Sequence, residues 1–158
     1  MSNENIEVKV GALIMDPNTN TPIVVLKGVE SETVLPIWVG AFEANAIALE
    51  IEKVAPQRPM THDLLRNLII ECGLTANSVV ITELIENTFF ARIELLGENG
   101  QPVMIDARPS DAIALALRMD CQIFVSQNVL DVSAASQSSP TTDADTETGP
   151  DEWPELIG

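Results

Sequence analysis

The chain has few side chains of the kinds on which many enzymes and nucleic-acid-binding proteins depend. Its 158 residues include one histidine, no tyrosine, and eight lysines and arginines against 24 acidic residues. A protein that binds nucleic acid mainly by electrostatics needs a broad basic face to displace counterions, and a net charge of −16 argues against such a face. The charge does not exclude a small cationic site, or a metal ion that supplies positive charge.

The motifs that reveal many catalytic and metal sites by their spacing are also missing. Cys72 and Cys121 are far apart in the sequence and form no CxxC pair, so neither a zinc site nor a redox motif is indicated. There is no glycine-rich phosphate loop, no GxSxG elbow and no HExxH helix. With a single histidine and no motif that places Ser or Cys beside it, a nucleophilic triad is not indicated either.

Long hydrophobic segments are missing as well. No apolar run approaches the ~20 residues that span a membrane, and the first residues are polar, without the basic and apolar regions of a signal peptide. We therefore expect a cytoplasmic protein without a membrane partner. Hydrophobic residues make up 46% of the chain, but only four Phe and two Trp are present, so the core must be mainly aliphatic.

The spacing of apolar residues predicts one α+β domain over residues 1–130. Three strands precede two helices and three more strands precede a third helix, so we expect mostly antiparallel sheets in two three-stranded blocks. A last short strand follows the third helix. The predicted strands are 6–15, 22–27, 33–39, 79–85, 88–96, 101–106 and 121–125, and the predicted helices are 41–54, 61–72 and the segment after Arg108-Pro109.

The second and third predicted helices have different surfaces. Leu64, Leu65, Leu68 and Ile69 recur at helical spacing and predict a buried stripe on the second helix. The third helix mixes alanines with larger aliphatic residues. Its small side chains predict a surface able to pack very close to another element.

The composition changes at residue 131. Residues 131–158 hold seven acidic residues and no Lys or Arg, and consist largely of Ser, Thr, Asp, Ala and Pro. Because this segment offers little to bury, we predict a disordered acidic C-terminal tail. Within it, residues 151–157 combine acidic and apolar side chains, which is consistent with a docking peptide or with a frayed terminus.

Two Arg-Pro segments contain most of the chemistry that the sequence offers. Arg58 and Arg108 each precede a proline, and the residue before a proline is pushed out of the α region, which marks the start of a helix. We expect Thr61 and Ser110 to cap these two helices through their hydroxyls. A helix N-terminus preceded by an arginine is suited to binding an anion such as a phosphate.

An acidic residue follows each predicted cap within the first helical turn. Asp63 and Asp111 are placed to stabilise the positive end of the helix dipole, or to pair with the arginine that precedes each of them. His62 is the only imidazole in the chain, and therefore the one candidate for proton transfer near neutral pH. The structural alternative is two well-formed helix starts with local ion pairs.

Carboxylates near these segments predict a divalent-cation site. Asp106 ends the strand before the third helix, and Asp111 begins that helix. With Glu43 on the first helix they supply the oxygen ligands that a cation such as Mg²⁺ prefers. The alternative for Glu43, which is spaced to share a helix face with Ile47 and Glu50, is a solvated acidic stripe.

Three segments together resemble the bifunctional nuclease domain family. They are Leu35–Gly40 followed by Glu43, then Arg58–Leu65, then Ala107–Ala116, and they keep the order and spacing of the family across about residues 5–130. The resemblance implies a compact α+β domain with activity on both DNA and RNA.

The inventory and the resemblance predict a nuclease that hydrolyses phosphodiester bonds of DNA or RNA with a divalent cation. The predicted catalytic residues are His62, Asp63 and Asp111, and the predicted substrate-binding residues are Arg58, Arg108, Thr61 and Ser110. The alternative is a non-catalytic regulatory module whose helix starts bind a small anion or a partner's carboxylate. We also expect a homo-oligomer, because exposed edge strands and alanine-rich helix surfaces favour pairing.

Overall fold

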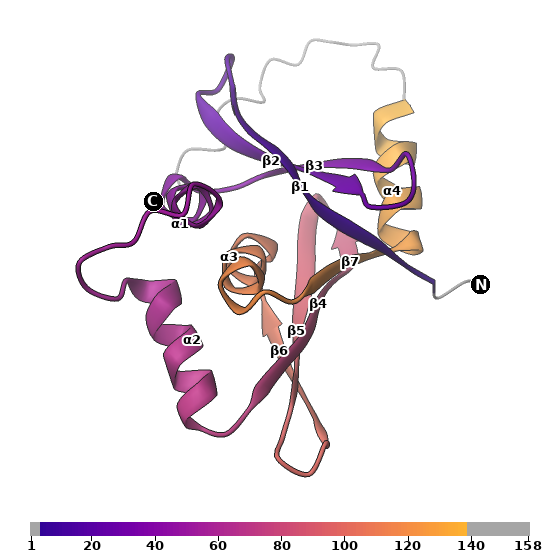
Figure 1. Cartoon of the computed structure of the whole chain (residues 1–158). Coiled ribbons are helices and arrows are strands. Elements are labelled where there is room, and N and C mark those ends of the chain that lie inside the picture. Colours follow the sequence, from indigo (N-terminus) through magenta and orange to yellow (C-terminus); the bar gives the residue numbers. More distant parts are fainter. Residues whose placement is uncertain (1–3, 139–158) are drawn as a thin grey trace.

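One seven-stranded mixed sheet forms the framework of the protein, for which a computed structural model describes residues 4–138 (Figure 1). The strands are β1 (Asn5–Asp16), β2 (Thr21–Gly28), β3 (Val34–Trp38), β4 (Thr75–Ile85), β5 (Thr88–Leu96), β6 (Pro102–Ala107) and β7 (Gln122–Ser126). Their order across the sheet is β3-β2-β1-β7-β4-β5-β6, and all neighbours are antiparallel except β4 and β7. The α+β class is confirmed, with the two predicted blocks joined through β7 into a single sheet.

Four helices accompany the sheet, one more than predicted. They are α1 (Ala41–Ile51), α2 (Thr61–Glu71), α3 (Pro109–Met119) and α4 (Gln127–Ser138). None of the helices in the described part of the chain is long and apolar enough to cross a bilayer.

The prediction that a disordered tail starts at residue 131 is wrong. Residues 131–138 belong to helix α4. The helix is held by its first turns, where Val129 is fully buried in the core and Leu130 packs against it. The hydroxyl of Ser126 accepts the backbone N–H of Val129 at 3.3 Å, and α4 packs on β4 and β7. The rest of the predicted tail, residues 139–158, lies outside the described residues.

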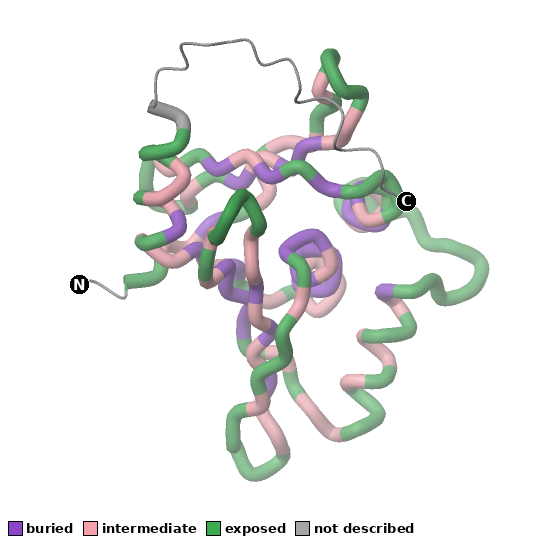
Figure 2. Tube along the Cα trace, turned by 180° about the vertical axis from the view of Figure 1, so that it is seen from behind, coloured by how far each residue is buried: buried purple, intermediate pink, exposed green. Residues whose placement is uncertain are grey.

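Helix α3 lies at the centre of the molecule and is its most buried helix (Figure 2). It packs against α1, α2, β4, β5 and β7. Ala112, Ala114 and Ala116 are at most 1% exposed, so their small side chains allow these neighbours to approach closely, as the sequence predicted. The largest fully buried side chains are all aliphatic: Leu26, Leu35, Ile47, Ile81, Leu95, Ile113, Val24, Val79, Val125 and Val129.

Helix α2 packs on its neighbour with a side that overlaps the predicted one only in part. Leu64, Leu65 and Leu68, predicted to be buried, are 54%, 40% and 52% exposed, and only Ile69 of the predicted stripe packs on the core. The one buried residue of α2 is His62. Because positions 62 and 69 share a face and that face meets α3, the leucines point away from the core.

Neither of the two predicted capping residues occupies the N-cap position of its helix. The N-caps are Met60 for α2 and Arg108 for α3, and neither side chain makes a capping hydrogen bond. In α3, Pro109 occupies the first helical position, where its missing N–H would have no partner in any case, so Ser110 falls inside the helix. In α2, Met60 has an extended backbone and Thr61 is already the first helical residue.

Candidate functional site

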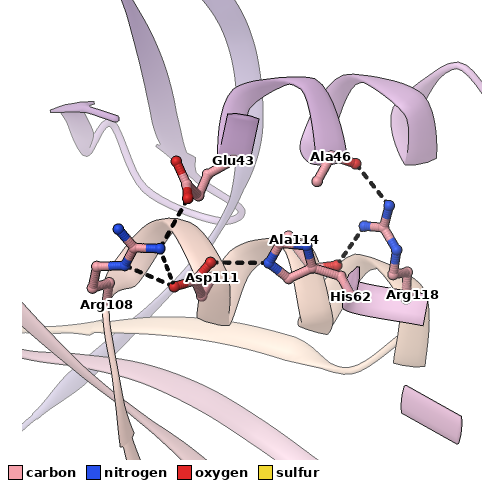
Figure 3. A network of polar contacts seen from close by, with 7 residues as sticks. All are labelled: Glu43, Ala46, His62, Arg108, Asp111, Ala114 and Arg118. Atoms are coloured by element: carbon pink, nitrogen blue, oxygen red, sulfur yellow. Dashed lines mark hydrogen bonds and ion pairs between the residues drawn. The ribbon is translucent and has the colours of Figure 1, made fainter. Parts of the chain in front are cut away.

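A chain of polar contacts at the start of α3 connects three helices (Figure 3). Arg108 donates through Nε to Oδ2 of Asp111 at 2.7 Å, and through NH2 to Oε2 of Glu43 on α1 at 2.9 Å. The other carboxylate oxygen of Asp111, Oδ1, lies 2.9 Å from Nε2 of His62 on α2. We refer to Glu43, His62, Arg108 and Asp111 as the polar site.

The polar site is covered on its acidic side and open at the arginine. The side chains of His62, Glu43 and Asp111 are 10%, 17% and 28% exposed, whereas that of Arg108 is 65% exposed. The hydrogen bond to Asp111, with a smaller contribution from the charge of Glu43, raises the pKa of Arg108. Arg108 therefore presents a permanent positive charge to solvent, anchored from behind by two carboxylates.

A second arginine, Arg118, holds the first turn of α2 in place. Its Nε donates to Oδ1 of Asp63 at 2.9 Å, its NH1 to the carbonyl of Ala114 at 2.9 Å, and its NH2 to the carbonyl of Ala46 at 3.0 Å. Asp63 also accepts the backbone N–H of Met60 at 2.9 Å, and this bond, more than Arg118, lowers the pKa of Asp63. These contacts favour a positioning role for Asp63.

Sequence reasoning missed Arg118, although a signal for it is present. Residue 118 follows Asp111 by seven positions, or two helical turns, so both side chains lie on the same face of α3. Of the two local ion pairs considered from the sequence, Arg108 with Asp111 forms. Asp63 pairs instead with Arg118, far from it in sequence.

The two Arg-Pro segments do not contribute equally to the polar site. Arg58 is exposed in the loop before α2 and makes no hydrogen bond or ion pair with any residue that the structure describes. Thr61 is exposed at the start of α2, while Ser110 is only 6% exposed inside α3. Substrate binding by Arg58, Thr61 and Ser110 stays a prediction, and Arg108 is the predicted substrate-binding residue that lies in the polar site.

The predicted cation ligands do not form a ready metal site. Asp106 is exposed on β6, opposite Arg92 of β5, while both oxygens of Asp111 and Oε2 of Glu43 are bound by Arg108 and His62. Within residues 4–138, no group of three or more His, Cys, Asp and Glu side chains is placed to hold a metal ion. These contacts do not fit a Mg²⁺ ion bound by the three predicted carboxylates, and the requirement for a cation stays a prediction.

A cavity of about 420 Å³ lies between the end of α1 and α2. Its lining includes Asp63, Lys53 and Arg66, but no residue of the polar site. The NH2 of Arg66 donates to Oδ1 of Asn67 at 3.1 Å, whereas its Nε is buried without a hydrogen-bond partner among the described residues. Basic and polar groups therefore line this cavity beside α2.

The fold is a mixed sheet with a central helix, and that helix presents an anchored, exposed arginine beside a His–Asp pair, an arrangement suited to binding an anion such as a phosphate. The chain belongs to the bifunctional nuclease domain family, whose profile matches residues 24–138. The matched range contains all four residues of the polar site. The resemblance found from three sequence segments is thereby confirmed.

Similar proteins include one close relative of unknown activity and more distant plant nucleases. An uncharacterized protein of Mycobacterium tuberculosis is 41% identical over 124 residues, which cover 78% of this chain and 73% of the relative. Bifunctional nuclease 2 of Arabidopsis thaliana is 26% identical over 119 residues, covering 69% of this chain and 36% of the plant protein. Bifunctional nuclease 1 of Oryza sativa subsp. japonica is 25% identical over 101 residues, covering 63% and 30%. The chain thus spans about a third of these plant relatives.

Proposed function

We propose that this protein is a nuclease that hydrolyses phosphodiester bonds of DNA or RNA at the polar site. The observation that supports this most directly is that Asp111 binds the only imidazole of the chain through one oxygen and the exposed Arg108 through the other. A carboxylate bonded to an imidazole fixes the orientation of the ring for proton transfer. An arginine beside it offers a planar set of donors that suits a phosphate.

Each residue of the polar site has a distinct role in this proposal. His62 transfers the proton between the attacking water or leaving oxygen and the enzyme, and Asp111 orients it. Arg108 uses Nε and NH2 to bind the carboxylates, while its NH1 contacts no acidic group of the described residues and is free to bind a phosphate oxygen. Glu43 holds the guanidinium in this orientation.

An exposed aromatic side chain on the same helix as Glu43 supports an unpaired strand as substrate. Phe42 directly precedes Glu43 on α1 and is 78% exposed, the highest value among the exposed large hydrophobic residues of the described chain. An aromatic side chain left in water provides a surface on which an unstacked base can lie. We therefore propose single-stranded nucleic acid as the preferred substrate.

The proposal is tested with labelled single-stranded DNA and RNA oligonucleotides and highly purified protein. His62→Ala and Asp111→Asn should each lower the cleavage rate by on the order of 10²-fold or more, since positioned proton transfer contributes about that much. Asp120→Asn is the matched control, because Asp120 ends α3 with a left-handed backbone that Asn also tolerates. Wild-type rates in folded His62→Ala would exclude the polar site as the catalytic centre.

The predicted cation is tested in the same assay. Activity that EDTA abolishes and added Mg²⁺ restores would establish a divalent requirement. Full activity after exhaustive EDTA treatment would remove the cation from the proposal and leave the roles of His62 and Arg108 unchanged.

One observation favours a second function, a non-catalytic module that binds an anion or a partner's carboxylate. Every charged side chain of the polar site is already paired with another, so the network is complete without a substrate. This function predicts no turnover in pure protein, together with thermal stabilisation by phosphate-bearing ligands that is lost in Arg58→Ala or Arg108→Ala.

A further inference from the structure

We propose that the cavity between the end of α1 and α2 binds a small organic phosphate through Arg66 and Lys53. It is a binding site separate from the polar site, none of whose residues line it. The ligand class is a phosphate monoester attached to an organic group about the size of a nucleoside. The proposal does not rest on the nuclease activity proposed above, since binding is measured without turnover.

The cavity has the size and the mixed lining of a small-molecule site. Its volume of about 420 Å³ lies within the range of about 300–1,000 Å³ that ligand pockets occupy. The loop between the two helices contributes apolar side chains to the lining, namely Val54, Ala55, Pro56 and Pro59. Lys53, Arg66 and Asn67 add hydrogen-bond donors to it. Apolar walls together with a few polar donors suit a ligand that is part organic group and part anion.

Arg66 is held in the wall of the cavity with an incomplete set of hydrogen bonds. Its NH2 donates to Oδ1 of Asn67 at 3.1 Å, while its Nε is buried and has no partner among the described residues. A buried N–H without an acceptor costs free energy. Because a single hydrogen bond holds the guanidinium, the group is able to turn toward a phosphate in the cavity. Phosphate oxygens supply the missing acceptors and match the planar fork of a guanidinium.

Lys53 is placed at the cavity by the turn that ends α1. It follows the C-cap Glu52 and has a left-handed backbone with a φ of +58°. Its backbone N–H donates to the carbonyl of Glu50 at 3.2 Å, and the N–H of Val54 donates to the carbonyl of Leu49 at 2.9 Å. The side chain makes no ion pair with any residue that the structure describes. Lys53 therefore adds a positive charge without an acidic partner to the lining.

The acidic side chains of the lining do not cancel its positive charge. Asp63 is already paired with Arg118 at 2.9 Å. Of the remaining charges, Lys53 and Arg66 are positive and Glu50 is negative, so two charges against one leave a net charge of +1. This balance favours an anion. The carboxylate of Glu50 should weaken its binding by repulsion.

The experiment is isothermal titration calorimetry of the full chain with adenosine monophosphate, inorganic phosphate and adenosine. The monophosphate should bind, inorganic phosphate should bind more weakly, and adenosine should show no measurable binding, because it lacks the anion. Equal affinities for the monophosphate and inorganic phosphate would overturn the organic part of the ligand. Absence of binding by either phosphate would overturn the site.

Two variants of the lining should change the affinity in opposite directions. Arg66→Met keeps an unbranched side chain and should weaken monophosphate binding by about tenfold or more, the value of one hydrogen bond between charged groups. Without ligand, its melting temperature should equal or exceed that of the wild type, because the buried N–H without an acceptor is gone. Glu50→Gln should tighten binding a few-fold by removing the repulsion. Unchanged affinity in folded Arg66→Met would overturn the proposal.

A matched pair of lysine variants controls for net charge. Lys53→Gln and Lys9→Gln each remove one exposed positive charge, and Lys9 lies on β1 outside the cavity. Only Lys53→Gln should weaken binding, and equal losses in both variants would reduce the effect to net charge and overturn the contact. Binding that survives Arg66→Met but is lost in Arg108→Ala would place the phosphate at the polar site and overturn the cavity as its site.

Discussion

The two Arg-Pro segments begin alike and end in different surroundings. In α3 the proline is the first helical residue, so Arg108 is the N-cap and reaches both Asp111 and Glu43. In the other segment Met60 intervenes, and α2 begins two residues after Pro59, which leaves Arg58 in the loop. A shift of two residues between proline and helix start thus decides whether the arginine joins the polar site. The same dipeptide marks a helix start in both cases but does not determine the position of its arginine.

The largest expected difference is in the loss of folding stability when a buried or an exposed arginine is replaced by alanine. Arg118 is 4% exposed and binds Asp63 and two carbonyls, so Arg118→Ala leaves these acceptors without a partner. We expect it to lower the free energy of unfolding by about 3–5 kcal/mol. Arg58→Ala should change it by no more than ~0.5 kcal/mol. Urea denaturation measures both, and equal effects would contradict the structural difference between the two arginines.

Side-chain size should matter in α3 and very little in α2. Ala112 is fully buried, so Ala112→Leu should destabilise the fold by about 1–3 kcal/mol through overpacking. Leu64 is 54% exposed on α2, so Leu64→Ala should change the free energy of unfolding by no more than ~0.5 kcal/mol. Thermal and urea unfolding at low concentration compare the two variants. A large loss in Leu64→Ala there would show that α2 packs against its own chain.

Activity should depend more on the arginine in the polar site than on the one outside it. Under the proposed function, Arg108→Ala removes the phosphate contact and should lower kcat/KM by roughly tenfold or more, which corresponds to about 1.4 kcal/mol. Arg58→Ala should have a smaller effect. Steady-state cleavage of the same oligonucleotide checks this order, and a greater loss in Arg58→Ala would place the substrate on the loop before α2.

The smallest expected effect is the loss, at acid pH, of the folding stability that Asp63 contributes. The pKa of Asp63 is lowered in the folded protein from its ordinary value of 3.8 by the Met60 N–H and, to a lesser extent, by Arg118. A lowered folded-state pKa stabilises the fold above the ordinary value, and this contribution is lost as pH falls through the folded value. The stability difference between wild type and Asp63→Asn should therefore be constant near neutral pH and shrink below about pH 4. A difference that grows on acidification would contradict the assignment.

Local patterns predicted most elements of the fold, because strand alternation and turn residues are local signals. A proline within a strand favours an edge position or a bulge, and β3, which contains Pro36, is at the edge of the sheet. Glycine is common directly after the end of a helix, and Gly73 has a φ of +80° directly after the C-cap of α2. Helix α4 was missed because residues 131–138 have a polar composition, while the buried Val129 that holds the helix lies before them.

The polar site was predicted only in part, because tertiary contacts decide which side of a helix is buried. Helical spacing identifies the apolar stripe of Leu64, Leu65 and Leu68 on α2, but it does not tell whether that stripe packs on the core or is exposed. His62, Asp111 and Glu43 were predicted from residue chemistry and do come together. Arg118 and the exposed position of Arg58 follow from how α1, α2 and α3 pack, which no single segment contains.

The pairing of the first strand affects when the protein can fold during its synthesis. Residues 5–8 of β1 pair with β7, while residues 8–16 pair with β2. β1 therefore joins the two halves of the sheet, and its partner β7 begins only at Gln122. During synthesis on the ribosome, the sheet of β1, β2 and β3 lacks its pairing with β7 until nearly all of the described chain has emerged. Such distant pairing slows folding and lengthens the time during which unpaired strand edges are open to association with other nascent chains.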